Sequence, residues 1–137
     1  MPVVDITMVR GRSAEQVRTI ADIAHFALAD IFEVPVEDRF QVIHQVEPHE
    51  LIFDEEFGGG PRTSDFILIR VTAGWPRPLE VKRTFYSTLV ERLDAQAGLD
   101  PENVFIMLDN VELSDLSLGG GRPFDLHATH GPGRPRG

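Results

Sequence analysis

Apolar residues recur at helical spacing a short distance after the start of the chain, between two stretches that read as strands. Ser13 can cap this helix, and Gln16, three residues later, completes a capping box. Residues 3–8 and 40–46 are the two predicted strands, with a turn at Gly11 and an end to the helical segment at Pro35. The apolar positions that follow the helical period are Val17, Ile20, Ala21, Ala24, Leu28 and Ile31.

The same order of strand, helix and strand returns in the second half. Residues 66–72 and 104–108 are the predicted strands. Pro78 suits the first turn of the helix between them, and Gly98 provides its stop. The apolar face of that helix is supplied by Phe85, Leu89, Leu93 and Ala97.

The two halves are copies of one unit. A shift of 65 residues superimposes the chain on itself without a gap, with eight identities across residues 7–40, where about two are expected by chance. The identical pairs are Thr7/Thr72, Arg12/Arg77, Glu15/Glu80, Arg18/Arg83, Thr19/Thr84, Leu28/Leu93, Glu37/Glu102 and Phe40/Phe105. Strand–helix–strand crossovers give parallel strand pairs with right-handed connections. The duplication therefore predicts two parallel pairs of strands.

The expected fold is α+β: a four-stranded, mainly parallel-paired sheet with two helices on one face. Residues 66–71 are mostly apolar on both faces of their strand, so the face away from the helices needs a cover, which predicts an obligate oligomer. We expect one domain over residues 1–137, with repeat halves at about 2–46 and 66–110. The Gly- and Pro-rich tail from about residue 120 is expected to be flexible.

Composition narrows the possible partners. The chain of 137 residues has no cysteine, which excludes a disulfide scaffold, a thiolate nucleophile and any Cys-ligated metal. Its net charge of −9 argues against nucleic acids and anionic membranes, although an anionic small molecule can still bind where arginines gather. No apolar run approaches membrane-spanning length and no leader precedes Val3, so a cytoplasmic location is expected.

Pro2 stands where removal of Met1 would leave a secondary amine at the end of a buried strand. An ordered, partly desolvated amine can have its pKa moved into the range where it acts as base, acid or nucleophile. The alternative for this position alone is a frayed terminus with a chance proline.

Several segments together resemble the tautomerase superfamily, whose members use an N-terminal proline. They are Pro2 before a short strand, Gly11-Arg12-Ser13 at the helix start, and the duplicated β-α-β plan. The long members closest to malonate semialdehyde decarboxylase are more similar still. They share residues 35–42 (PVEDRFQV), 62–66 (RTSDF), 109–110 (DN) and 115–119 (DLSLG), so that the resemblance covers about residues 2–121.

The resemblance implies the site residues and the assembly. The catalytic proline matches Pro2, and the acidic partner of the decarboxylase matches Asp38. Of the two arginines that bind the substrate carboxylate, Arg77 matches one, while Trp75 or Gly74 stands at the other. A homotrimer is implied for duplicated chains. The tryptophan usual near the end of the family pattern is replaced by Leu116.

Other polar residues have both a structural and a functional interpretation. Arg70 interrupts an apolar strand, so it either pairs with Asp5 or Glu80 or makes a second substrate contact. Trp75 is expected to line the pocket or an interface, and the loop Gly58–Gly60 could act as a lid. No cofactor or metal is expected, because no carboxylate is spaced to complete a site with the histidines His44, His49, His127 and His130.

These features predict a cofactor-independent enzyme that uses Pro2 for proton transfer on a small oxo or unsaturated carboxylate held by Arg77. A neutral Pro2 amine would support enol–keto tautomerisation, and a cationic one would support decarboxylation of a 3-oxo acid or hydration of an activated multiple bond. A carboxylate about 4 Å away, at an effective dielectric near 20, attracts the cation by ~4 kcal/mol, so Asp38 favours the cationic form. The alternative is a catalytically silent oligomeric module that binds a carboxylate or a protein.

Overall fold

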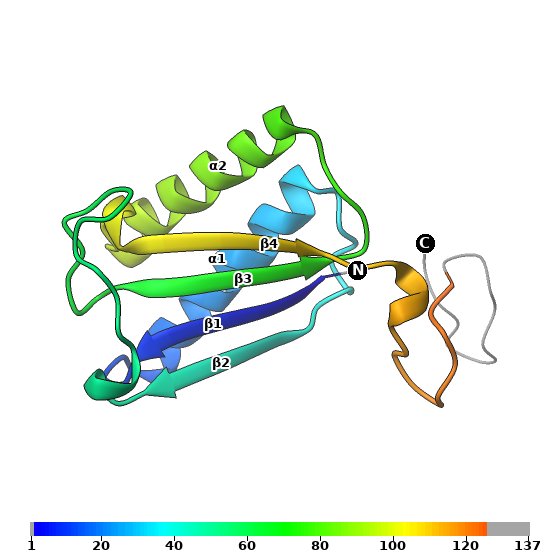
Figure 1. Ribbon diagram of the computed structural model, residues 1–137, viewed down its shortest axis with the longest axis horizontal. Coiled ribbons are helices and arrows are strands. Elements are labelled where there is room, and N and C mark those ends of the chain that lie inside the picture. The colour runs from blue at the N-terminus through cyan, green and yellow to red at the C-terminus, as the bar shows by residue number, and fades with distance from the viewer. Residues whose placement is uncertain (1, 126–137) are drawn as a thin grey trace.

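The computed structural model describes residues 2–125, which form a four-stranded sheet with two α-helices packed on one face (Figure 1). Along the chain the order is β1 (Val3–Val9), α1 (Ala14–Ile31), β2 (Gln41–Val46), β3 (Ile67–Ala73), α2 (Leu79–Ala97) and β4 (Val104–Asn110). In the sheet the order is β2-β1-β3-β4. The pairs β1/β2 and β3/β4 are parallel, and β1 pairs with β3 antiparallel. The predicted α+β fold with two parallel pairs is confirmed.

The repeat in the sequence corresponds to a repeat of secondary-structure elements in the fold. Helices α1 and α2 begin at Ala14 and Leu79, which are 65 residues apart. The Ser13 hydroxyl accepts from the Gln16 N–H (3.1 Å) and the Gln16 side chain accepts from the Ser13 N–H (2.8 Å), so the predicted capping box forms. Gly98 ends α2 with φ of 65°, as its role as a stop requires.

Pro78 differs from its predicted place in the first helical turn. It is the N-cap of α2, with an extended backbone (ψ 156°) and without a side-chain cap, and the helix starts at Leu79. Since a proline ring fixes φ at about −65° in either position, its presence alone does not distinguish the cap from the first turn.

Three short 3-10 helices follow β2, precede β4 and follow β4 in the described chain: η1 (Pro48–Glu50), η2 (Pro101–Asn103) and η3 (Leu113–Asp115).

The core lies between the helices and the facing side of the sheet. Alternate residues of β1 and β3 point into it, because side chains alternate between the two faces of a strand. The helices contribute their apolar stripes, including Leu28 of α1 and Phe85 of α2, both fully buried. The fully buried strand residues include Ile6, Met8, Ile67, Ile69 and Val71.

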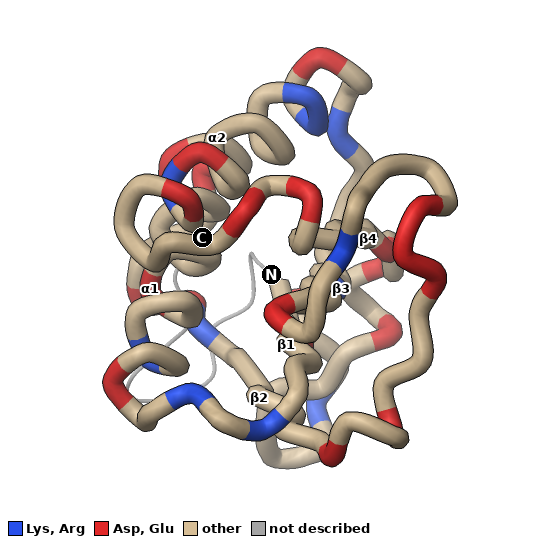
Figure 2. The backbone as a smooth tube through the Cα atoms, turned by 90° about the vertical axis from the view of Figure 1, so that its left-hand side faces the viewer, with Lys and Arg blue, Asp and Glu red and all other residues tan. Residues whose placement is uncertain are grey.

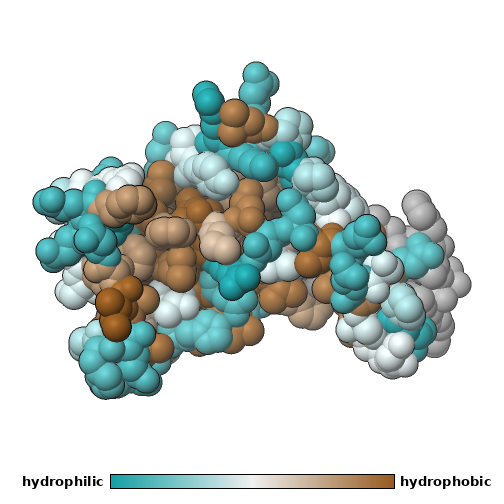
Figure 3. All heavy atoms as spheres, viewed as in Figure 1, coloured by the Kyte–Doolittle hydropathy of each residue, from teal (hydrophilic) through white to brown (hydrophobic). Residues whose placement is uncertain are grey.

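The opposite face of the sheet has no layer over it within the described chain (Figure 1). Val42, Phe105 and Met107 are 47%, 46% and 39% exposed, although they lie on β2 and β4 of the sheet. Figure 3 shows this face of the sheet, on which a strip of polar side chains divides the apolar surface. Two ion pairs contribute polar groups to the strands: His44 with Asp5 and Arg70 with Asp109.

The connection between β2 and β3 lies at the far end of the sheet from Pro2, because β2 runs parallel and β3 antiparallel to β1. Its glycine loop is tethered there, with the Gly60 N–H donating to Glu102 (2.6 Å) and the Thr63 N–H to Asn103 (2.7 Å). The idea that Gly58–Gly60 covers the pocket of its own chain is therefore wrong. The predicted flexible tail and His127 and His130 fall largely on residues 126–137, outside the described residues, as does Met1.

None of the helices in the described range is both long and apolar enough to cross a membrane.

Candidate active site

One end of the sheet gathers the residues singled out from the sequence. Val3 pairs with Thr72 in the antiparallel β1/β3 ladder, so Pro2 precedes β1 at the same end where β3 leads into Trp75 and Arg77. The segment after α1 returns to this end as well and carries Asp38 into β2. In Figure 1 this is the end marked N, towards which the arrow of β3 points.

Pro2 is buried, and the strand register places it beside the Asp38 segment. The Val4 N–H donates to the carbonyl of Phe40 (2.9 Å), and Val4 pairs with Gln41 in the parallel ladder. Continued by two residues, this register sets Pro2 level with Arg39, next to Asp38. The first strand therefore brings Pro2 beside the segment that carries Asp38.

The Asp38 carboxyl sits in a turn that is itself ordered. The backbone N–H of Asp38 donates to the carbonyl of Pro35 (3.0 Å), and this hydrogen bond closes the turn that follows α1. Burial raises the pKa of Asp38 and Glu37 raises it further, while His25 acts to lower it. A half-buried carboxylate of this kind is poorly solvated, so its field on a neighbouring amine is little screened.

Arg77 presents a partly desolvated cation at the same end. Its guanidinium donates to the carbonyls of Trp75 (2.7 Å) and Phe32 (3.3 Å), and lies 4.6 Å from the centroid of the Phe32 ring. Burial lowers the pKa of Arg77, but a guanidinium remains charged at neutral pH. Within residues 2–125 no carboxylate forms an ion pair with it. The contacts that orient its charge are therefore with neutral groups.

Trp75 and Arg70 occupy different surroundings. Trp75 is exposed beside Arg77, with its ring centroid 5.7 Å from the guanidinium. Arg70 lies on the uncovered face of β3 and pairs with Asp109 of β4 (2.6 Å). Neither Asp5 nor Glu80, the two partners expected for Arg70, takes this place, since Asp5 bonds to His44 (2.8 Å). Asp5 lies opposite Arg70 in the β1/β3 ladder, but its carboxylate bonds to His44 of β2, and Arg70 pairs with Asp109 on its other side.

Charge is otherwise spread over the molecule. Figure 2 shows acidic residues along the helices and connecting loops, and basic residues scattered without a continuous stripe. In the part of the chain that the structure describes, no three or more His, Asp or Glu residues are grouped so as to hold a metal ion. The ionisable side chains that were singled out from the sequence and that lie at this end of the sheet are Asp38 and Arg77.

Comparison with known proteins identifies the family. One model described as a tautomerase enzyme matches residues 38–119, and a second with the same description matches residues 2–58. The probable tautomerase YusQ of Bacillus subtilis (strain 168) is 34% identical over 122 residues, which is 89% of this chain and 96% of that protein. The chain belongs to the tautomerase family. The probable tautomerase YrdN of the same organism is 29% identical over 87% of this chain and 92% of its own length.

Solved tautomerase-fold structures agree with this assignment. A malonate semialdehyde decarboxylase, from a study of decarboxylase and hydratase activities, superposes with a TM-score of 0.82 at 32% identity, covering 88% of this chain and 93% of that one. A fused 4-OT described as a symmetric trimer superposes with a TM-score of 0.72 at 16% identity, covering 88% of this chain and 94% of that one. The second likeness concerns the fold alone.

The structure of this tautomerase adds residues that the sequence did not single out. Phe32 supplies both a ring and a carbonyl to Arg77, and His25 is a buried histidine that contacts the segment bearing Asp38. The sequence could have pointed to His25, because it is a polar residue among the apolar positions of the first helix. Phe32 carried no such signal, since its contact with Arg77 spans 45 residues.

Proposed function

We propose that this tautomerase is a cofactor-independent enzyme that transfers protons to or from a small oxo or unsaturated carboxylate through the amine of Pro2. Removal of Met1 would make that amine the first group of the chain. The observation that carries the proposal is Arg77, a half-buried guanidinium without a carboxylate partner in the described residues, at the sheet end that also holds Pro2 and Asp38.

Each residue has a role in the proposed reaction. Arg77 binds the substrate carboxylate by charge-assisted hydrogen bonds. Trp75 lines the pocket beside it. Asp38 favours the cationic Pro2 amine, because an anion nearby stabilises the positive form. The cation then donates a hydrogen bond to the substrate carbonyl or a proton to a developing carbanion.

Decarboxylation of a 3-oxo acid is the preferred reaction. The bond between C1 and C2 breaks, CO2 leaves, and its electron pair forms an enolate that the Pro2 ammonium stabilises and protonates. Similarity to the malonate semialdehyde decarboxylase, at 32% identity, supports this choice. Hydration of an activated multiple bond suits the same cationic amine. Enol–keto tautomerisation needs the neutral amine, and the two probable tautomerases of Bacillus subtilis favour it as the second candidate.

The enzyme is also proposed to act as a homotrimer. The uncovered sheet face, with Val42, Phe105 and Met107 exposed, needs a partner surface. The trimeric fused 4-OT has the same fold and supports this assembly.

The test uses protein whose intact mass shows loss of Met1, assayed against 3-oxo acids, unsaturated acids and enol substrates. We expect Pro2→Ala to lower turnover by at least about 100-fold, the contribution of a positioned acid–base group, because it replaces the rigid secondary amine of proline with a primary amine that is free to rotate. Arg77→Lys should raise KM more than it lowers kcat, since a lysine cannot keep the forked contact. Arg18→Ala, an exposed arginine on α1, is the control. Carboxylate binding without turnover, unchanged by Pro2→Ala, would instead indicate a silent binding module.

A further inference from the structure

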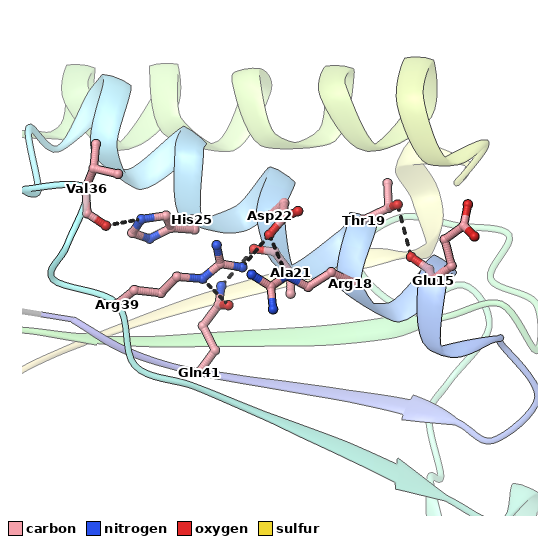
Figure 4. Close-up of polar contacts among 9 residues, drawn as sticks. All are labelled: Glu15, Arg18, Thr19, Ala21, Asp22, His25, Val36, Arg39 and Gln41. Atoms are coloured by element: carbon pink, nitrogen blue, oxygen red, sulfur yellow. Dashed lines mark hydrogen bonds and ion pairs between the residues drawn. The ribbon is translucent and has the colours of Figure 1, made fainter.

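The turn that bears Asp38 has no regular secondary structure, yet it is fastened to helix α1 on both sides of the carboxyl group. Figure 4 shows His25 and Asp22 projecting from α1 towards this segment. They are three positions apart and therefore lie on one face of the helix. His25 reaches Val36, two residues before Asp38, and Asp22 reaches Arg39, one residue after it.

The contact before Asp38 is a part-buried hydrogen bond from a buried histidine. Nε2 of His25 lies 2.7 Å from the carbonyl oxygen of Val36, and His25 is 2% exposed. A carbonyl can only accept, so Nε2 carries the hydrogen and donates it. Losing this bond would be costly on the His25 side, because a buried ring nitrogen would be left without its acceptor.

The contact after Asp38 is an ion pair with a supporting amide. Arg39 donates to Asp22 (2.6 Å) and to the side-chain oxygen of Gln41 (2.9 Å), and Gln41 in turn donates to the carbonyl of Ala21 (2.8 Å). The hydrogen bond from Arg39 is the largest cause that lowers the pKa of Asp22. These bonds fix the backbone directly after Asp38 at two points of α1.

The Asp22 carboxylate also accepts a hydrogen bond from Arg18, so Arg18 can be compared directly with Arg39. The Arg18 side chain is 71% exposed and that of Arg39 only 22%. Arg18 bonds to Asp22 at 3.0 Å within the helix and is bonded to nothing else in Figure 4. An exposed i, i+4 pair contributes little, whereas Arg39 joins two elements.

We propose that Arg39 and His25 are positioning residues, which clamp the Asp38 turn onto α1 and thereby set the distance from the Asp38 carboxylate to the Pro2 nitrogen. This inference rests on the proposed function of Pro2 and Asp38. Among the described residues, the charged groups that act on Asp38 are His25 of α1 and Glu37 of the turn itself. Releasing Arg39 would let the carboxylate recede while Arg77, on another element, keeps its place.

The experiment measures the Pro2 amine by 15N NMR titration and the Asp38 carboxyl by 13C NMR titration in Arg39→Ala, Asp22→Asn and Arg18→Ala. A carboxylate that recedes from ~4 to ~6 Å, at an effective dielectric near 20, loses about one pKa unit of its effect on the amine. We therefore expect the pKa of Pro2 to fall by about one unit in Arg39→Ala and Asp22→Asn, and kcat at pH 8 to fall about tenfold with KM little changed. Arg18→Ala should alter neither value, and Arg39→Lys should recover part of the loss.

Unchanged Pro2 and Asp38 titrations in folded Arg39→Ala and Asp22→Asn would overturn the clamp. So would equal effects in Arg18→Ala, because that variant leaves the turn untouched. If Arg39→Ala or Asp22→Asn does not fold, the other variant is compared with Arg18→Ala. His25→Gln keeps a side-chain N–H that can donate to the Val36 carbonyl and His25→Leu does not, so comparing the two tests the contribution of that hydrogen bond. Both titrations are read without substrate, so the clamp is tested even if Pro2→Ala shows that the proposed reaction is wrong.

Discussion

Among single residues, Asp38 combines a cost to stability with a proposed role in the reaction. Burial raises its pKa above the ordinary value, so between the unfolded and folded pKa values the folded protein binds more protons. Stability therefore falls as pH rises through the folded pKa, and the ionised carboxylate destabilises the fold at pH 7. Removing the charge should relieve this cost.

We expect Asp38→Asn to melt at the same temperature as the parent protein or higher at pH 7, and to lose this advantage as the pH approaches 4. Its decarboxylase or hydratase turnover at pH 8 should fall at least about tenfold, and any enol–keto activity much less, because the neutral amine needs no anion. Thermal melts over a pH series and parallel assays check both. Equal losses in the two activities, or a variant less stable at pH 7 than at pH 4 relative to the parent, would contradict this role.

The site residues differ in how far the sequence could predict them. Pro2, Asp38, Trp75 and Arg77 were recognised through family motifs, and the structure places them at one end of the sheet. Phe32, which stacks on Arg77, was not, because its importance arises from a contact between separate elements. The partner of Arg70 also differs from the prediction, because Asp5, which lies opposite it in the β1/β3 ladder, bonds to His44 and leaves Arg70 to pair with Asp109.

At the scale of elements, the ends of the helices are governed by local chemistry. Gly98 ends α2 at φ of 65°, and a Cβ added there would meet no atom within 4 Å. Gly98→Ala therefore suffers backbone strain alone and should lower the free energy of unfolding by about 1 kcal/mol. Gly119, with equally open surroundings and no positive φ, is the matched control, and Gly119→Ala should change stability little. Urea unfolding measures both, and equal losses would show that the left-handed conformation is not the cause.

Elements also show where local patterns are insufficient. The capping box at Ser13 and the stop at Gly98 form as predicted, because their hydrogen bonds join residues a few positions apart. Strand ends differ by one or two residues: the last strand was expected to end at 108 and extends to Asn110. The pairing partner decides such ends, since Asn110 stays in the sheet by pairing with Ala73.

At the scale of the whole molecule, the uncovered sheet face leads to a prediction about assembly. Phe105→Arg would place a charge among the exposed apolar side chains of this face and should shift the proposed trimer to smaller species in light scattering after gel filtration. Leu79→Arg, at a residue 60% exposed at the start of α2, is the control and should leave the mass unchanged. A parent protein that already runs as a folded monomer would refute the proposed trimer.

The duplicated unit, the helix caps and the apolar faces follow from the sequence, because they depend on residues close together in the chain. Tertiary structure alone decided how the two units join. The antiparallel pairing of β1 with β3 puts the start of one strand beside the end of the other, and so brings Pro2 to the turn that carries Arg77. It also decided the contacts that flank Asp38, in which His25 of α1 donates to the carbonyl of Val36 and Arg39 donates to Asp22 of α1. Contacts between residues far apart in the chain form only when whole elements pack, and no local pattern encodes them.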